Sequence, residues 1–287
     1  MILPNLIYVG AEKSGSTSIH RVLSNHSEIF SIRKETEFFS FYNKQIKRDY
    51  HINCIDKYSK LFSDSNKYKY RMDVSTTYLH HPDAIKNIKR LVKDVKILIC
   101  LRNPIDRAYS RYWMSAKNNF ELTKYSPKKF MEYFRNHQTD ISWSNVRDRG
   151  FYSKRIKQIY KNFDKKNILV LFYEDLKNNE DYFFKQIFKF LKIKNPRLQK
   201  NKKFADSLYS ENILLHRLFN LSLKKGLPDN KITRLLKIIY KMLRQRFLKQ
   251  YPKMGDWEKS ELLKFYLDDI EDLEKFLKVN LNKWKKI

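Results

Sequence analysis

Cysteine is scarce in this chain, which has only Cys54 and Cys100 among its 287 residues. Two cysteines supply neither a disulfide framework nor a cysteine metal cluster. Cys100 lies within an apolar run, so we expect it to be a small core residue. This cysteine usage is typical of a protein from a reducing compartment.

Long apolar runs are also missing. No apolar run approaches the roughly 20 residues that a helix needs to cross a bilayer. The chain enters its first apolar segment soon after Met1, without the pattern of a secretory signal peptide. We therefore expect a cytoplasmic protein without a transmembrane segment, for which peripheral contact with a membrane surface stays open.

Acidic residues are the under-represented charge, since 31 Asp and Glu oppose 60 Lys and Arg, for a net charge of +29. Such a field attracts polyanions, including nucleic acid, acidic glycans and anionic lipid. With 20 Phe, 19 Tyr and 42% hydrophobic residues, the composition is that of a globular protein. The charge indicates an anionic ligand without naming it. A basic nucleic-acid-binding protein is one alternative, although the chain carries no recognised binding motif for it.

Glycine is rare as well, with 5 in the whole chain, yet Gly10 and Gly15 lie close together near the N-terminus. The apolar run before Gly10 predicts a buried strand, and apolar residues at helical spacing follow Gly15, namely Ile19, Val22 and Leu23. A strand, a glycine-containing loop and a helix bind phosphate, because backbone N–H groups and the helix dipole face the anion. Hydroxyl donors are predicted in the first turn at Ser16, Thr17 and Ser18.

This loop departs from the standard nucleotide triphosphate loop, in which lysine follows the second glycine as GxxxxGK[ST]. Here Ser16 follows Gly15, and the lysine, Lys13, lies inside the loop. A lysine at that position would lie beside the leaving oxygen of the bound anion. We predict an anion site here; an ordinary turn between strand and helix, with a chance lysine, is the alternative.

A second junction between strand and helix follows the most strand-like run, Val95–Leu101, whose continuous apolarity suits a central parallel strand. Asn103 suits a helix N-cap, and Asp106 completes a start that resembles a capping box. Ser110 lies nearly two turns into this helix, on the side of its N-terminus. Arg102 and Ser110 could therefore converge on one anion at the carboxyl edge of the sheet. The alternative is that Arg102 pairs with a nearby acid and Ser110 only packs.

The order of the elements predicts an α/β fold with a P-loop-like central parallel sheet flanked by helices. Further strands are expected near residues 71–78 and 167–173, and this core covers about residues 5–192. The remainder, about 197–287, is predicted to be helical, with helices near 209–224, 230–248 and 257–284. We expect one domain over residues 1–287.

Two of these segments resemble the donor-binding motifs of sulfotransferases that use 3′-phosphoadenosine 5′-phosphosulfate (PAPS). Residues 10–17, Gly-Ala-Glu-Lys-Ser-Gly-Ser-Thr, resemble the 5′-phosphosulfate loop. Residues 101–112 look like the 3′-phosphate motif, and both motifs occur in the expected order. Residues 35–39, Glu-Thr-Glu-Phe-Phe, resemble the acid–Phe-Phe element of the heparan-type enzymes. Shorter matches are found at 150–152 and 173–176.

The resemblance implies a role for each matching residue. Lys13 would balance charge on the bridging oxygen as it leaves, and Glu35 would take a proton from the acceptor. Arg102 and Ser110 would hold the 3′-phosphate, and Lys253 is a candidate for a loop that covers the donor. The implied donor-binding set is Gly10, Lys13, Ser14, Gly15, Ser16, Thr17, Ser18, Arg102, Ser110 and Lys253.

The sequence departs from the heparan-type pattern at residues 73–78, where those enzymes often have Glu-Lys-Ser/Thr-Pro-x-Tyr. Val74 replaces the lysine and Thr76 replaces the proline, so a second catalytic lysine is missing there. Asp73 and Tyr78 remain as candidate contacts to the acceptor.

The resemblance implies sulfuryl transfer from PAPS to a hydroxyl or amine of a carbohydrate acceptor, with 3′-phosphoadenosine 5′-phosphate (PAP) as the other product. Sulfuryl transfer resembles phosphoryl transfer in relying on positioning and charge stabilisation, but the sulfuryl group carries less charge. We therefore expect no metal, and no specific nucleic acid as a partner. A P-loop nucleotide-dependent kinase is the alternative of the same class.

Overall fold

The computed structural model describes residues 1–44, 52–118, 126–136, 146–196, 208–210 and 248–287. Two compact units alternate along the chain. The first comprises residues 1–107, 151–201 and 266–286, and the second comprises residues 108–150, 202–265 and 287. The prediction of a single domain over residues 1–287 stays a prediction.

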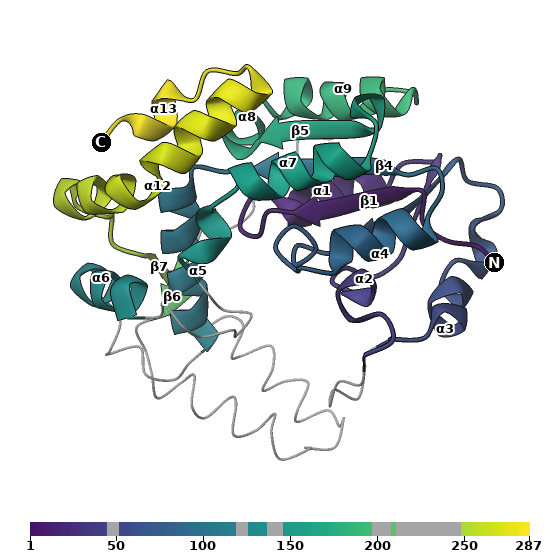
Figure 1. Cartoon of the computed structure of the whole chain (residues 1–287), viewed down its shortest axis with the longest axis horizontal. Helices are drawn as coiled ribbons and strands as arrows, with labels where there is room; N and C mark the ends of the chain where they lie inside the picture. Colours follow the sequence, from purple (N-terminus) through teal and green to yellow (C-terminus); the bar gives the residue numbers. More distant parts are fainter. Residues whose placement is uncertain (45–51, 119–125, 137–145, 197–207, 211–247) are drawn as a thin grey trace, which may run out of the picture. The chain divides into compact units, whose positions relative to one another are not determined.

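The first unit is built on a five-stranded sheet in the order β2-β3-β1-β4-β5, in which every pairing is parallel (Figure 1). This confirms the predicted parallel α/β sheet. Its central strand, β1, leads directly into the glycine-containing loop, so that loop emerges between the ends of β3 and β4. The strands are β1 (Leu6–Gly10), β2 (Ile29–Ser31), β3 (Tyr70–Val74), β4 (Lys96–Leu101) and β5 (Ile168–Phe172).

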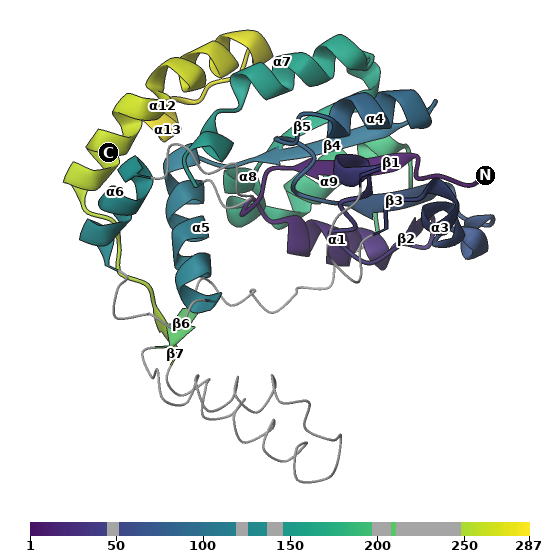
Figure 2. The same cartoon turned by 60° about the horizontal axis from the view of Figure 1, so that its bottom comes forward.

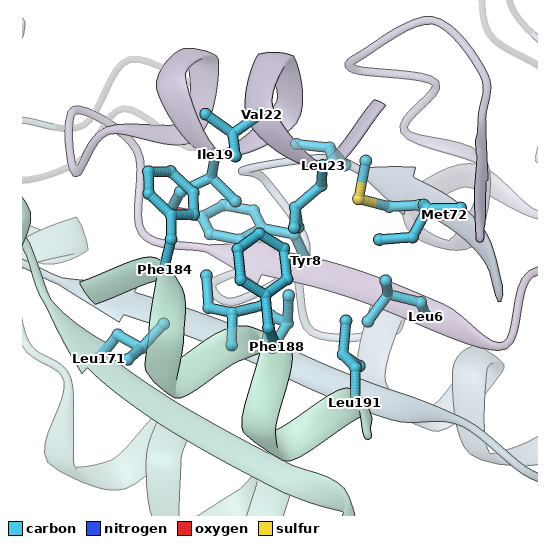
Figure 3. Packing of buried hydrophobic residues seen from close by; sticks show 14 of the residues in the cluster. Leu6, Tyr8, Ile19, Val22, Leu23, Met72, Leu171, Phe184, Phe188 and Leu191 are labelled. Carbon is cyan, nitrogen blue, oxygen red and sulfur yellow. The ribbon is translucent and has the colours of Figure 1, made fainter. Parts of the chain in front are cut away.

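Helices cover both faces of this sheet. Leu6 and Tyr8 of β1 point to one face, where they pack with apolar side chains of α1 (Ser16–Ser24) and α9 (Glu180–Leu191) (Figure 3). Because side chains alternate along a strand, Ile7 and Val9 point to the other face. Figure 2 shows α4 (Ala84–Leu91) and α7 (Ser153–Asn162) on the face away from α1. Burial on both faces explains the continuous apolar runs that identified these strands.

Strand β2 was not predicted from the sequence. It contains three residues, Ile29–Ser31, and pairs only with β3, at the edge of the sheet. A run of three residues is too short for alternation to be read. Shorter helical elements of the first unit are α2 (Phe38–Phe41), α3 (Ile55–Lys60), η1 (Ser63–Ser65), η4 (Lys165–Asn167) and α8 (Tyr173–Asn178).

In the second unit, β6 (Leu208–Ser210) and β7 (Leu248–Gln250) pair as antiparallel strands. The predictions of helix at residues 209–210 and at 248 were therefore wrong, because pairing between distant segments does not show in local periodicity. The rest of both predicted helices lies outside the described residues. Helix α5 (Pro104–Asn118) runs from the first unit into the second, where α6 (Pro127–Asn136) and η3 (Asp148–Gly150) also lie.

The predicted helix at 257–284 is interrupted. It forms α12 (Asp256–Leu277) and a separate short helix, α13 (Asn282–Lys285). Lys278 has a φ of 55°, in the left-handed region that ends a helix. The carboxylate of Glu274 then accepts a hydrogen bond from the backbone N–H of Leu281 at 2.6 Å. The helical character of the C-terminal third is confirmed for α12 and α13, although not its continuity, whereas its described residues 208–210 and 248–250 form strands.

Candidate active site

The phosphate loop, residues 10–18, joins β1 to α1. Gly10 has a φ of 145° and Gly15 a φ of 83°, which favour glycine. A Cβ atom on Gly15 would lie 2.5 Å from Cδ2 of Leu176, and one on Gly10 would lie 2.9 Å from Cβ of Leu79. Both glycines are therefore required by backbone conformation and by close packing.

A buried ion pair anchors the phosphate loop from within. Oε1 of Glu12 lies 2.9 Å from Nη1 of Arg107, whose side chain is 0% exposed. The backbone N–H of Ala11 donates to the carbonyl of Cys100 at 2.7 Å, which ties the loop to β4. Ser14 donates its hydroxyl to the carbonyl of Glu12 at 3.3 Å. In this conformation the hydroxyl of Ser14 stabilises the loop.

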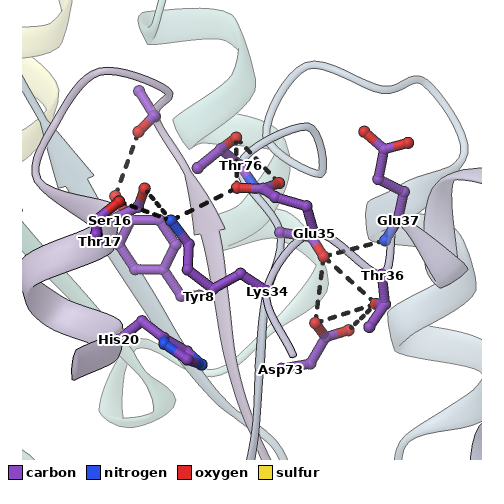
Figure 4. Close-up of polar contacts among 12 residues, drawn as sticks. Tyr8, Ser16, Thr17, His20, Lys34, Glu35, Thr36, Glu37, Asp73 and Thr76 are labelled. Carbon is purple, nitrogen blue, oxygen red and sulfur yellow. Dashed lines mark hydrogen bonds and ion pairs between the residues drawn. The ribbon is translucent and has the colours of Figure 1, made fainter. Parts of the chain in front are cut away.

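The N-terminus of α1 combines N–H groups with hydroxyls. The N-cap is Gly15, which has no side chain, and the first N–H groups of a helix have no partner within the helix. Beside them, Nζ of Lys34 donates to Oγ of Ser16 at 3.0 Å and to Oγ1 of Thr17 at 3.1 Å (Figure 4). Ser18 follows in the same turn and is half-buried. The phosphate loop thus meets a cation that the sequence reasoning missed, because Lys34 comes from a different loop.

Arg102, from the predicted 3′-phosphate motif, contacts the phosphate loop. Its Nη1 donates to the carbonyl of Lys13 at 3.0 Å, and its guanidinium lies 4.7 Å from the ring centroid of Tyr173. Its Nε is buried and has no hydrogen-bond partner among the described residues. A buried donor without a partner is unusual in a folded protein. It suits a site that receives an anionic group, so the donor-site residues of the first unit fit a bisphosphate.

The predicted N-cap of α5 is confirmed, since Oδ1 of Asn103 accepts from the N–H of Ile105 at 2.9 Å. The prediction that Asp106 completes a capping box was wrong. The backbone N–H of Asn103 donates to Oε1 of Glu174 at 2.9 Å, whereas Asp106 is exposed. Burial raises the pKa of Glu174. A carboxylate from α8, distant in sequence, therefore replaces the local one.

Glu35 belongs to the acid loop, residues 34–37, which lies against the end of β3. Its N–H donates to the carbonyl of Val74 at 2.8 Å, and its Oε2 accepts from the N–H of Thr76 at 2.9 Å. The side chain is 38% exposed, and Nζ of Lys34 lies 3.9 Å from its Oε1. Partial desolvation raises the pKa of Glu35, against the opposing effects of Thr76 and Lys34. The carboxylate is therefore held in place and still open to an acceptor.

Asp73 and Tyr78 occupy a different environment, because both are 0% exposed. Oδ2 of Asp73 accepts from the hydroxyls of Tyr58 at 2.6 Å and Tyr78 at 2.7 Å. The hydroxyls of Thr36 and Ser75 also donate to this carboxylate, and burial raises the pKa of Asp73. Contact of Asp73 and Tyr78 with an acceptor stays a prediction that this burial disfavours. Their observed contacts support the acid loop through Thr36.

Ser110 and Lys253 belong to the second unit. Ser110 is buried in α5, and Lys253 is exposed. The convergence of Arg102 and Ser110, and a role for Lys253, stay predictions. Among the described residues, no group of three or more His, Cys, Asp or Glu is placed to hold a metal ion. No helix in the described part of the chain is long and apolar enough to cross a membrane.

The family can now be stated. The family model described as "Sulfotransferase domain" matches residues 3–286, so the chain belongs to that family. A crystal structure of a sulfotransferase from Alicyclobacillus acidocaldarius superposes over 100% of both chains with a TM-score of 0.73 and 22% identity. That likeness supports the fold.

Heparan sulfate appears in the names of several relatives, of which two illustrate the match. The chain is 25% identical over 164 residues to heparan sulfate glucosamine 3-O-sulfotransferase 3B1 of Mus musculus, covering 56% of this chain and 39% of that protein. It is 26% identical over 289 residues to bifunctional heparan sulfate N-deacetylase/N-sulfotransferase 1 of Xenopus laevis, covering 96% of this chain and 30% of that protein. The chain thus spans less than half the length of either relative.

Proposed function

We propose that this protein transfers a sulfuryl group from PAPS to a hydroxyl or amine of a carbohydrate acceptor. The observation that carries this proposal is the meeting of three features at one sheet edge: the phosphate loop, the guanidinium of Arg102 and the held carboxylate of Glu35. Membership of the family favours this reaction over the kinase and nucleic-acid-binding alternatives.

The donor is expected to bind through its phosphates. The N–H groups of residues 14–18, with the hydroxyls of Ser16 and Thr17, suit the 5′-phosphate. The buried Nε of Arg102 suits the 3′-phosphate, with Ser110 and Lys253 as further proposed contacts. Each of these groups donates hydrogen bonds, which is the chemistry that a dianionic phosphate requires.

The transfer is an in-line displacement in which atoms and charge balance. Glu35 accepts the proton of the acceptor hydroxyl or amine while the acceptor atom bonds to sulfur. The bond between sulfur and the bridging oxygen breaks, and its electron pair stays on that oxygen, where Lys13 balances the charge. PAP and the sulfated acceptor are the products. Catalysis then rests on positioning and electrostatic stabilisation.

The acceptor class rests on the relatives and on charge. The heparan sulfate enzymes among the relatives suggest a glycan, and a net charge of +29 favours an acidic one. A cytoplasmic location remains part of the proposal, as does the absence of a metal requirement.

Calorimetric titration with PAP, beside ATP with magnesium, tests the donor. We expect micromolar binding of PAP and none of ATP. Removing a charged hydrogen-bond partner costs about 1.5–3 kcal/mol, so Arg102→Ala should weaken PAP binding about 10- to 100-fold. An absence of PAP binding, or a preference for ATP, would contradict the proposal and favour the kinase.

A further inference from the structure

Lys34 contacts both halves of the proposed transfer site. Its Nζ lies 3.0 Å from Oγ of Ser16, 3.1 Å from Oγ1 of Thr17 and 3.9 Å from Oε1 of Glu35. Figure 4 shows its side chain crossing from the acid loop to the phosphate loop, with Glu35 on the opposite side of the ammonium group. The ammonium group therefore occupies the space between donor-binding hydroxyls and proposed base.

We propose that Lys34 is a second catalytic cation, which contacts the oxygens of the sulfuryl group during its transfer to the acceptor. This inference rests on the proposed function. Lys13 would balance charge on the leaving oxygen, whereas Lys34 would act between the phosphate loop and Glu35. The bonds that form and break, and the transfer of the acceptor proton to Glu35, are unchanged.

The hydrogen bonds of Lys34 prepare the loop hydroxyls for an anion. An ammonium group has three donors and no acceptor, so the oxygens of Ser16 and Thr17 must act as acceptors toward it. Each hydroxyl then has its own hydrogen available for another partner. Both hydroxyls are thereby arranged to donate to an oxygen atom of a bound ligand.

The position of Lys34 also compensates for a residue that the sequence lacks. Val74 stands where the heparan-type pattern has a lysine, and its side chain is 1% exposed in the core. The N–H of Glu35 donates to the carbonyl of Val74 at 2.8 Å, so the acid loop lies directly beside that position. Lys34 can thus supply a cation from the neighbouring loop.

The environment of Lys34 is not that of an ordinary surface lysine. Its side chain is 22% exposed, and burial lowers its pKa. The protein holds this partly desolvated cation between two hydroxyls and a carboxylate whose pKa is itself raised. A cation stabilises a developing negative charge more strongly in such a site than in bulk water, because less water is present to screen the interaction.

The test compares Lys34→Ala and Lys34→Arg with Lys60→Ala, which removes the same charge from an exposed position of α3. Release of PAP from radiolabelled PAPS would be followed in single turnovers at saturating enzyme, with chemically desulfated heparin present and absent. PAP affinity would be measured in parallel, because PAP lacks the sulfuryl group.

We expect Lys34→Ala to slow the single-turnover step by on the order of 10²–10³, the usual cost of losing one electrostatic stabiliser. PAP affinity should fall far less than the rate, because the loop N–H groups and Arg102 still hold the phosphates. Lys34→Arg should keep part of the rate, and Lys60→Ala should match the wild type. The retained PAP affinity also shows that the variant is folded.

Three results would overturn the role of Lys34. In the first, Lys34→Ala lowers PAP affinity and the rate at limiting PAPS by the same factor but leaves the rate at saturating PAPS unchanged. Lys34 would then only anchor the 5′-phosphate. A shift in the pH profile alone would make it only a neighbour of Glu35, and an unchanged rate would make it a solvated lysine. A wild-type protein that binds no PAP, or binds it without transfer, would instead contradict the proposed function itself.

Discussion

The phosphate loop and the acid loop lie at the same edge of one sheet but are held in different ways. Two glycines and the buried pair of Glu12 and Arg107 fix the phosphate loop. The acid loop contains no glycine, and Glu35 adopts a left-handed φ of 58°. The acid loop is stabilised instead by hydroxyl groups that donate hydrogen bonds to the buried carboxylate of Asp73. The glycines of the phosphate loop are a local signal in the sequence, whereas the acid loop was identified only through its resemblance to the acid–Phe-Phe element, because the carboxylate that supports it is distant in sequence.

The largest expected effect belongs to the acid loop. Glu35→Gln keeps the shape of the side chain but removes the proton acceptor, so transfer should slow by roughly 10²–10⁴. PAP affinity should be preserved, because the phosphate loop is untouched. Single-turnover transfer and PAP titration of the same sample would check this, and a variant that keeps its turnover would exclude Glu35 as the base.

The phosphate loop should respond slightly less in the transfer step. Lys13→Ala removes the charge proposed to balance the leaving oxygen, and the rate should fall by on the order of 10²–10³ or more. Release of PAP under saturating PAPS would measure it. A variant with normal turnover would show that the leaving oxygen is stabilised by another group.

The buried pair should govern folding more than chemistry. Arg107→Met removes the guanidinium that lies 2.9 Å from Oε1 of buried Glu12, and the free energy of unfolding should fall by about 3–5 kcal/mol. Chemical denaturation would measure the change. The double variant with Glu12→Gln is the control, and it should recover part of the loss because both charges of the buried pair are then removed. A single variant as stable as the wild type would show that the pair does not anchor the loop.

The smallest effect is expected in the pH profile. The base must be deprotonated, so activity is lost as the pH falls through the raised pKa of Glu35, above its ordinary value of 4.5. Lys34 opposes this rise in the pKa of Glu35, whereas the charge of Glu37 reinforces it. Lys34→Ala should therefore move the acidic limb of the rate profile to higher pH. A limb at or below 4.5 in the wild type would contradict the desolvation argument.

The sequence allowed the sheet and part of the site to be predicted, because these features have local signals. The apolar runs of β1 and β4 predicted strands buried on both faces. The rule that ligands bind at the carboxyl ends of parallel strands predicted Arg102 at that edge, where the structure shows it donating to the carbonyl of Lys13. Contacts between distant residues could not be predicted in this way. Lys34 reaches Ser16 across 18 positions, and Arg107 reaches Glu12 across 95.

The burial of a carboxyl group could not be predicted from the sequence either. Asp73 and Glu35 both lie near polar, hydroxyl-bearing segments of the sequence, and both were candidates for chemistry. Only packing separates them, since Asp73 is enclosed by tyrosine and threonine hydroxyls while Glu35 remains 38% exposed. Burial is a property of the assembled fold, so residue type and spacing alone could not show it; only the family resemblance had assigned Glu35 as the base and Asp73 as a candidate contact to the acceptor.

The ammonium group of Lys34 also limits how this loop can change over evolution. The substitution Ser16→Lys would turn residues 10–17 into the GxxxxGK[ST] pattern of nucleotide triphosphatases in a single step. Yet Oγ of Ser16 lies 3.0 Å from Nζ of Lys34 in a largely buried setting. The new lysine would therefore meet a like charge at short range. Lys34 therefore disfavours the triphosphate-type lysine at position 16 for as long as its own ammonium group lies against this turn.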